Sequence, residues 1–315
     1  MASQQAPSST RPESDEGDEP ALKAPTLRRP GQRARTPYIF IAPSIVLVVL
    51  VMAYPVAYGI RNTFWEVNLL TPDEPFIGFE NYVEVFTDPQ FFNALTRSLI
   101  FVAGTVLLGM IIAMSFALVL HNIGFGRRIF RGTALLPYFV SGVAAAVMWR
   151  FFFSADAGIV NALLDRAGGP TPVWLGEEVP ALVVVTLANI WYVSPFATLI
   201  LLAGLQMMDG TLLEAAKIDG ATPTQMFRHI IFPTLAPQVA LALVWLSFSS
   251  FNIFDLILPM TGGGPGRATE VLALYMYGLA FNQLNFGTAS VVMALLLTIN
   301  AGLSLLYLKL FPRDM

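Results

Sequence analysis

Six runs of about 20 mostly apolar residues alternate with polar segments along the 315-residue chain. Each run is long enough to cross the roughly 30 Å hydrocarbon core of a bilayer. Because no water is available in that core to bond the backbone polar groups, each run is predicted to be an α-helix. The expected spans are about 38–59, 98–120, 132–153, 181–204, 237–258 and 288–310. The pattern therefore predicts an all-α, six-helix integral membrane protein.

The composition supports this prediction and excludes several kinds of chemistry. Apolar residues make up 55% of the chain and charged residues only 12%, against about 25% charged residues in a soluble domain. The absence of cysteine excludes disulfides and cysteine-based metal sites. His121 and His229 are far apart and have no clustered carboxylates, so a histidine metal site is not predicted. No basic surface favours nucleic-acid binding.

Residues 1–36 are predicted to be a disordered tail, acidic in its first half and basic in its second. The tail lacks the apolar residues that a folded core needs. The apolar run that follows has no obvious small-x-small cleavage site, which favours a retained anchor over a signal peptide. Residues 37–315 are then expected to form the transmembrane domain, with outward loops that are compact caps.

The positions of the basic residues predict the orientation in the membrane. Cytoplasmic loops carry an excess of Lys and Arg. Of the 18 basic residues, 13 lie on the side of the tail. These are Arg11, Lys23, Arg28, Arg29, Arg33, Arg35, Arg127, Arg128, Arg131, Lys217, Arg228, Lys309 and Arg313. Both termini are therefore expected to be cytoplasmic.

The longest inward connection, residues 206–236, is predicted to hold two short helices. Thr211 with Glu214 fits a capping box that starts the first helix. Gly220 is suited to the left-handed residue that ends it. A second capping box is expected at 222–225, with Pro223 at the first helical position.

The second of these helices has an apolar face made by Met226, Phe227, Ile230 and Ile231, and Pro233 is expected to end it. Two readings of the connection stay open at this point. It is either a pair of helices that only packs on the bundle, or a rigid knob that seats in a groove of an ATP-hydrolysing subunit. The chain has no Gly-x-x-x-x-Gly-Lys-Ser/Thr motif, so ATP hydrolysis by a P-loop would require a separate subunit.

The run Glu214-Ala-Ala-Lys-Ile-Asp-Gly220, with Phe232-Pro233 further on, resembles the EAA loop of bacterial ABC importer permeases. Other segments resemble the carbohydrate branch of that family, which includes the maltose and glycerol-3-phosphate permeases. They are Ala134-Leu-Leu-Pro137, Trp191-Tyr-Val-Ser-Pro-Phe196, Leu202-Ala-Gly-Leu-Gln206, Phe254-Asp-Leu-Ile257 and Thr261-Gly-Gly-Gly-Pro265. The likeness runs from about residue 38 to the C-terminus. Phe232 departs from it, since Leu is usual before this proline.

The resemblance implies a bacterial inner-membrane transport subunit that is not itself an enzyme. It implies a second permease subunit, two ATPase subunits and an extracytoplasmic solute-binding protein as partners. ATP and Mg²⁺ would bind to the ATPase, and this chain would hold no cofactor. The residues expected to couple to the ATPase are Glu214, Ala215, Ala216, Asp219, Gly220, Phe227, Ile230 and Pro233.

A solute path is predicted along the fourth and fifth spans. Pro195 has no N–H, so the carbonyl of Trp191 loses its helical donor. Aromatic faces beside polar groups suit a sugar, but small and polar residues also hold membrane helices together. The candidates are Asn189, Trp191, Tyr192, Ser194, Trp245, Ser249 and Asn252. Asp255, near the outer end of its span, is expected to be a structural or gate residue.

The leading hypothesis is therefore the permease subunit of an ATP-driven importer for a sugar or related polyol. An ion-coupled carrier is the alternative, and it would need an acidic residue deep in a span, for which Asp255 is the only candidate. The chain also shows no internal repeat of the kind that builds many such carriers. An intramembrane enzyme is disfavoured because no Gly-x-Ser-x-Gly turn is present.

Overall fold

The computed structural model describes residues 36–71, 73–124 and 127–311. Except for Thr36, the predicted tail lies outside these residues. The chain divides into two compact units, Met1–Met52 and Ala53–Met315, which are described separately.

The described part of the first unit is helical. α1 (Thr36–Val48) contains Pro43 and leads into the π-helical turn η1 (Val49–Ala53). Apolar side chains are exposed on all faces of this helical unit. Leu47 and Leu50, for example, are 63% and 65% exposed. An all-round apolar helix is typical of a segment that crosses a membrane.

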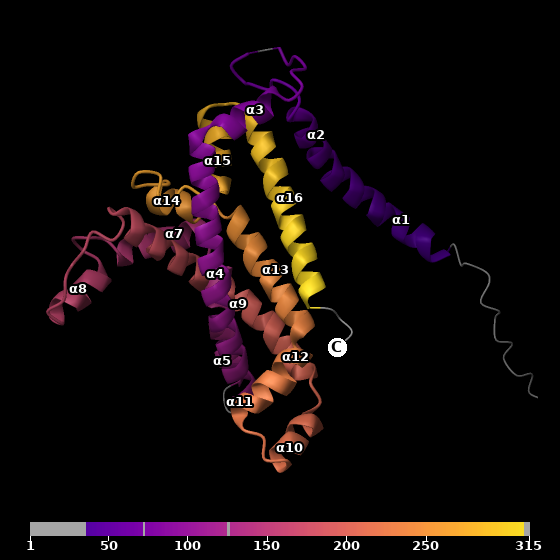
Figure 1. The fold of residues 1–315 in the computed structure, drawn as a ribbon, viewed down its shortest axis with the longest axis vertical. Helices are drawn as coiled ribbons and strands as arrows, with labels where there is room; N and C mark the ends of the chain where they lie inside the picture. The colour runs from indigo at the N-terminus through magenta and orange to yellow at the C-terminus, as the bar shows by residue number, and fades with distance from the viewer. Residues whose placement is uncertain (1–35, 72, 125–126, 312–315) are drawn as a thin grey trace, which may run out of the picture. The chain divides into compact units, whose positions relative to one another are not determined.

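The second unit is a bundle of four long helices, shown in Figure 1. They are α4 (Pro89–Asn122), α9 (Glu178–Met207), α13 (Ala236–Asn252) and α16 (Phe286–Leu310). α9 packs along α4, and α13 contacts α4, α9 and α16. At the centre, the fully buried Asn189 of α9 donates hydrogen bonds to the hydroxyls of Thr105 (3.1 Å) and Ser250 (3.0 Å). This one amide therefore joins α9 to both α4 and α13.

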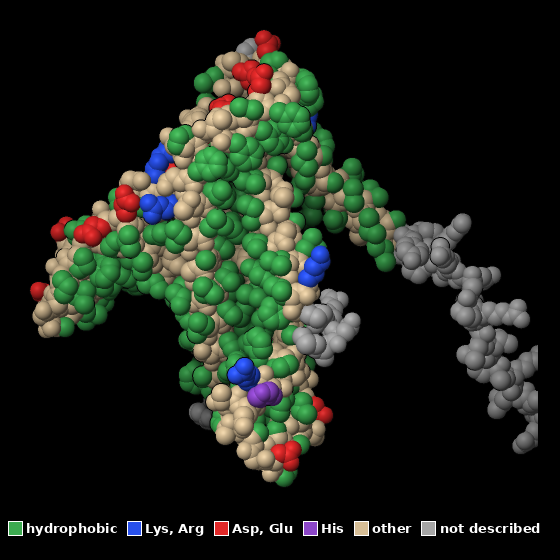
Figure 2. All heavy atoms as spheres, in the orientation of Figure 1, with side chains coloured by type: hydrophobic (Ala, Val, Ile, Leu, Met, Phe, Trp, Pro, Cys, Tyr) green, Lys and Arg blue, Asp and Glu red, His purple; other side chains and the backbone are tan. Residues whose placement is uncertain are grey.

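Four described helices are long and apolar enough to cross a membrane: 41–62, 89–122, 178–207 and 286–310. A fifth span is obtained if Pro223–Thr234 and Ala236–Asn252, which meet at 74°, are counted together. The first, second, fourth and sixth predicted spans lie in or largely overlap these helices. Figure 2 shows the corresponding apolar surface along the length of the second unit.

The third predicted span, 132–153, is wrong as a single helix. The segment is divided among α5 (Arg127–Ala134), α6 (Leu136–Phe139) and α7 (Gly142–Phe152). Pro137 lacks the N–H that would continue α5, and Ser141 has extended backbone angles (φ −61°, ψ 139°). An apolar run alone does not reveal such breaks, because every piece remains apolar.

The fifth predicted span also ends earlier than expected. α13 stops at Asn252 and Ile253 is extended, so 253–258 does not continue the helix. The chain then forms α14 (Ile257–Thr261), α15 (Leu272–Tyr277) and the π-helical turn η3 (Gly278–Asn282), none of which was predicted. Of these short elements, α14 packs against α7, and α15 packs against α16.

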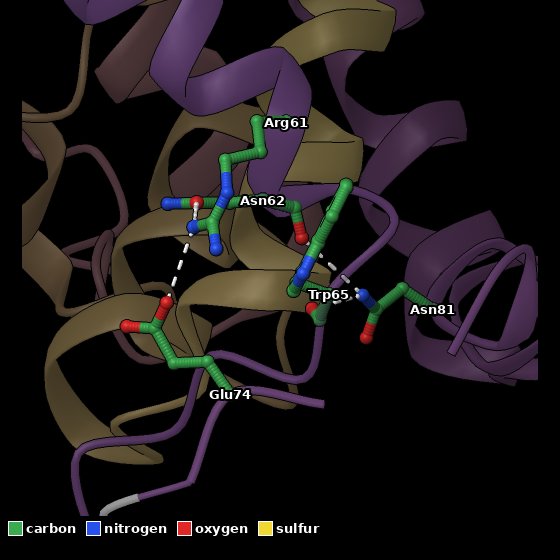
Figure 3. Close-up of polar contacts among 5 residues, drawn as sticks. All are labelled: Arg61, Asn62, Trp65, Glu74 and Asn81. Carbon is green, nitrogen blue, oxygen red and sulfur yellow. Dashed lines mark hydrogen bonds and ion pairs between the residues drawn. The ribbon is translucent and has the colours of Figure 1, made fainter. Parts of the chain in front are cut away.

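The connection after α2 (Tyr54–Asn62), predicted to face outward, is a compact cap that leads into α3 (Glu80–Thr87). Asn81 is buried, and its amide donates to the carbonyls of Asn62 (3.4 Å), Thr63 (3.1 Å) and Trp65 (2.9 Å). Figure 3 shows this amide reaching the backbone of the cap. The Arg61 guanidinium stacks 4.7 Å from the Trp65 ring and pairs with Glu74 at 3.1 Å. A second cap carries α8 (Ile159–Arg166).

Candidate functional site

The first candidate site is residues 209–235, called here the inward loop because the sequence predicts them on the inward side of the membrane. It begins with α10 (Gly210–Ile218), whose N-cap is Asp209 and not Thr211 as predicted. The Asp209 carboxylate accepts a hydrogen bond from the Thr211 backbone N–H at 2.9 Å, which lowers the pKa of Asp209. The expected Thr211–Glu214 box is therefore not formed, because the helix starts two residues earlier.

The turn between the two helices agrees with the prediction. Gly220 follows α10 with φ +78°, a left-handed conformation that favours glycine. Ala221 N–H then bonds back to the Ala216 carbonyl at 2.9 Å, as in a helix C-cap.

The second capping box is present at the start of α11 (Pro223–Met226). The Gln225 side chain accepts from the Thr222 backbone N–H at 2.8 Å, and the Gln225 N–H donates to the Thr222 hydroxyl at 3.4 Å. Pro223 lies at the first helical position, where its missing N–H is tolerated. The turn that joins α10 to α11 is therefore fixed on both sides.

The second short helix ends at Thr234, one residue after the predicted end at Pro233. It continues through η2 (Phe227–Ile231) and α12 (Phe232–Thr234), and the chain then turns sharply into α13 at the buried Leu235. Pro233 has no proton for a helical hydrogen bond, and the π-helical turn immediately before it changes the bonding pattern there.

The structure divides the predicted coupling residues between two faces of the inward loop. Phe227 packs against a buried hydrophobic cluster that includes Leu205 and Leu235. Ala216 is buried, and Ile230 and Pro233 are half-buried. Glu214, Ala215, Asp219 and Gly220 are exposed. Two apolar side chains are almost fully exposed in this part of the chain: Ile218 (86%) in α10 and Met207 (83%) at the end of α9.

The second candidate site is a cavity of about 360 Å³, called here the α9–α13 hollow. Four predicted path residues line it: Tyr192, Trp245, Ser249 and Asn252. It is completed by Tyr138, Val193, Ile253 and Asp255. Tyr138 was missed because it lies in a segment read as a plain span. The adjacent Pro137 was the available signal that the backbone changes direction there.

Aromatic rings form one wall of this hollow. The Trp245 ring lies 4.3 Å from the Phe196 ring and 5.8 Å from the Tyr138 ring, measured between centroids. The Trp245 indole N–H donates to the Val193 carbonyl at 3.1 Å. This carbonyl lies two residues before Pro195. The sequence had instead indicated that the carbonyl of Trp191 would lack its helical donor and be available for another hydrogen bond. The indole bond fixes the Trp245 ring in the wall.

The other predicted path residues lie elsewhere. Asn189 is fully buried between α4 and α13 and reaches no cavity surface. Trp191 and Ser194 line a different, mainly apolar cavity of about 650 Å³ between α4, α5, α7 and α9. Residues 189–194 point in different directions because an α-helix advances 100° per residue. Only part of the predicted cluster therefore shares one site.

The motif Thr261–Pro265 forms a loop held by side-chain hydrogen bonds. The hydroxyls of Thr261 and Thr269 lie 2.7 Å apart, and Thr269 also donates to the Gly264 carbonyl at 2.9 Å. Burial raises the pKa of Glu270, against the opposing effect of Arg267, whose guanidinium lies 3.2 Å away.

Residues 105–313 match the family described as "Binding-protein-dependent transport system inner membrane component". The chain belongs to this family. The matched range contains both the inward loop and the α9–α13 hollow. This inner-membrane component is thus a multi-pass transport protein of the ABC importer permease type.

Named relatives of this permease match it over most of its length. It is 33% identical to the "Trehalose/maltose transport system permease protein MalF" of Thermococcus litoralis, over 90% of this chain and 96% of that protein. It is 31% identical to the "Trehalose transport system permease protein SugA" of Mycobacterium tuberculosis, over 88% and 89%. It is 32% identical to the "Sulfoquinovosyl glycerol transport system permease protein SmoG" of Agrobacterium fabrum, over 86% and 89%.

A solved structure shares the fold of this permease. It is a bacterial ABC transporter involved in the import of the acidic polysaccharide alginate. The TM-score is 0.76 at 23% identity, covering 89% of this chain and 96% of that one.

Proposed function

We propose that this permease is a subunit of an ATP-driven, binding-protein-dependent importer for a sugar or related polyol. The observation that carries the proposal is the α9–α13 hollow, where the Trp245 and Tyr138 rings face the same space as the polar side chains of Ser249 and Asn252. Aromatic faces stack on sugar C–H groups while amides and hydroxyls bond the sugar hydroxyls. The trehalose and maltose systems named for its relatives support the same solute class.

The inward loop would be the element that an ATPase subunit pushes. Its α10 exposes Ile218 one helical turn after the exposed Glu214 carboxylate, a mixture suited to a groove on another protein. The caps at Asp209 and Thr222 make the loop rigid, so a force applied to it is passed to α9 and α13. ATP and Mg²⁺ would be held by two ATPase subunits, alongside a second permease and a solute-binding protein.

The proposal places both termini and the inward loop in the cytoplasm. Because the chain has no cysteine, single cysteines report sidedness without background. In intact cells, Asp73→Cys is expected to react with a membrane-impermeant thiol reagent, whereas Thr224→Cys reacts only after the membrane is opened. Labelling of Thr224→Cys from outside would reverse the proposed orientation.

The solute path is tested by Asn252→Ala, measured as uptake of a panel of labelled saccharides. Removal of the amide takes one hydrogen-bond partner from a solute held in the hollow, and the net loss of about 1 kcal/mol for one hydrogen bond corresponds to about fivefold lower uptake or a changed preference. Uptake should depend on ATP and persist when ion gradients are collapsed, which an ion-coupled carrier would not show.

Asn122→Ala is the matched control for this test. Both amides are exposed, and each donates to the carbonyl four residues earlier, at 2.7 Å for Asn252 and 2.9 Å for Asn122. Asn122 lies at the end of α4, outside the α9–α13 hollow. Equal uptake by the two variants would place the solute path elsewhere.

A further inference from the structure

The α9–α13 hollow contains one acidic side chain, Asp255, which neither the coupling mechanism nor the aromatic wall explains. None of the other residues that line the hollow is Lys, Arg, His, Asp or Glu. The ion pairs in the described part of the chain do not involve Asp255 either. The residue is half-exposed, so its carboxylate is in reach of a solute in the hollow.

Gly142 provides the space that the Asp255 carboxylate occupies beside the start of α7. A Cβ at Gly142 would overlap a carboxylate oxygen of Asp255, so the carboxylate packs directly on the first residue of α7. The first N–H groups of a helix have no helical acceptor, and the N-terminal end of the dipole favours a negative charge. Ser141, the N-cap residue, makes no side-chain capping bond that would compete.

We propose that Asp255 makes the α9–α13 hollow a charge filter, which accepts neutral saccharides and repels acidic ones. The inference rests on the proposed function, because it takes the hollow to be part of the solute path. A charge a few ångströms away in a partly dry site acts with little screening. The side chains of Tyr138, Trp245, Ser249 and Asn252 around it carry no positive charge.

Ser249→Cys provides a probe that does not depend on the identity of the solute. The full chain in membrane vesicles of both orientations is treated with two methanethiosulfonate reagents of similar size, one cationic and one anionic. The cationic reagent is expected to react about tenfold faster than the anionic one, relative to free cysteine in the same buffer. Addition of Asp255→Asn should bring this ratio close to that of free cysteine, while Asp255→Glu should keep it high.

Two controls separate a local field from other effects. Thr71→Cys, on an exposed outward loop, should show no comparable preference for the cationic reagent. Asp156→Asn removes an exposed outward acid and should leave the ratio at Ser249→Cys unchanged. If Asp255→Asn also leaves the ratio of the cationic to the anionic reaction rate unchanged, Asp255 has only a structural role at the start of α7, and the charge-filter proposal is wrong. No reaction in either orientation would mean that the hollow is not open to water, which also overturns it.

Uptake by the assembled importer provides the second test. The probes are maltose and a disaccharide in which one glucose is replaced by glucuronate. Asp255→Asn is expected to raise uptake of the acidic disaccharide relative to maltose by several-fold. The parent importer could take up no saccharide while Ser249→Cys still reacts much faster with the cationic reagent than with the anionic one. This result would reject the proposed sugar importer but would still support a negative field from Asp255. An Asp255→Asn variant with the parent's ratio of acidic to neutral uptake would reject the filter alone.

Discussion

Gly220→Val is expected to give a permease that inserts into the membrane but no longer stimulates an ATPase or transports solute. Gly220 has φ +78°, and a β-branched residue in that region is strained by about 1–3 kcal/mol. The strain falls on the turn that joins α10 to α11, so the two helices would change their relative direction. Solute-stimulated ATP turnover of the reconstituted importer is the measurement.

A graded series makes this test sharper. Asn tolerates the left-handed region better than Val, so Gly220→Asn should retain a large part of the ATP turnover. Gly210→Val is the matched control, because Gly210 begins α10 of the same loop, has no positive φ and has open space around it. Normal turnover in Gly220→Val would contradict the role proposed for the inward loop.

Gly204→Val is expected to prevent the bundle from folding. A Cβ at Gly204 on α9 would lie 2.7 Å from Gln238 Cγ and 2.7 Å from Leu235 Cδ2, both at the start of α13. Overpacking of a close helix contact costs about 1–3 kcal/mol or more, and small residues are what allow membrane helices to approach. The yield of monodisperse protein in detergent and its midpoint of thermal unfolding should both fall strongly.

Gly302→Val provides the comparison for this variant. Gly302 is also a glycine of a long helix, α16, but a Cβ there would meet nothing within 4 Å. Its yield and unfolding midpoint should stay close to those of the parent. A similar loss in both variants would indicate that valine in these helices is harmful in general and that the α9–α13 contact is not the cause.

Local signals in the sequence predicted parts of the inward loop well. Gly220 and the Thr222–Gln225 box were found because their conformations follow from the residues themselves. Thr211 was chosen as the first cap because it has a glutamate three residues later. The structure uses Asp209, which lies between the end of α9 at Met207 and the start of α10 at Gly210. Two capping residues so close together cannot be ranked without the path of the preceding helix.

Features that depend on packing were predicted less well. The third span was read as one helix because hydropathy averages over breaks such as Pro137 and Ser141. Asn189 and Tyr192 were grouped as path residues because they are close in sequence. The structure buries Asn189 between three helices and points Tyr192 into the hollow. Which helix face meets a cavity is decided by neighbours far along the chain, and these leave no local pattern.

The uninterrupted length of α4 has a mechanical consequence. Its 34 residues make a rod of about 50 Å, well beyond the roughly 30 Å hydrocarbon core. At the N-terminal end of α4, the Tyr275 hydroxyl donates to the Asp88 carboxylate at 2.6 Å. The C-terminal end of α4 packs in the buried cluster that contains Leu205. If a straight helix of this length tilts by about 5° around its centre, each end moves by about 2 Å, in opposite directions. Events at the two membrane surfaces are thereby linked without any bending of the helix.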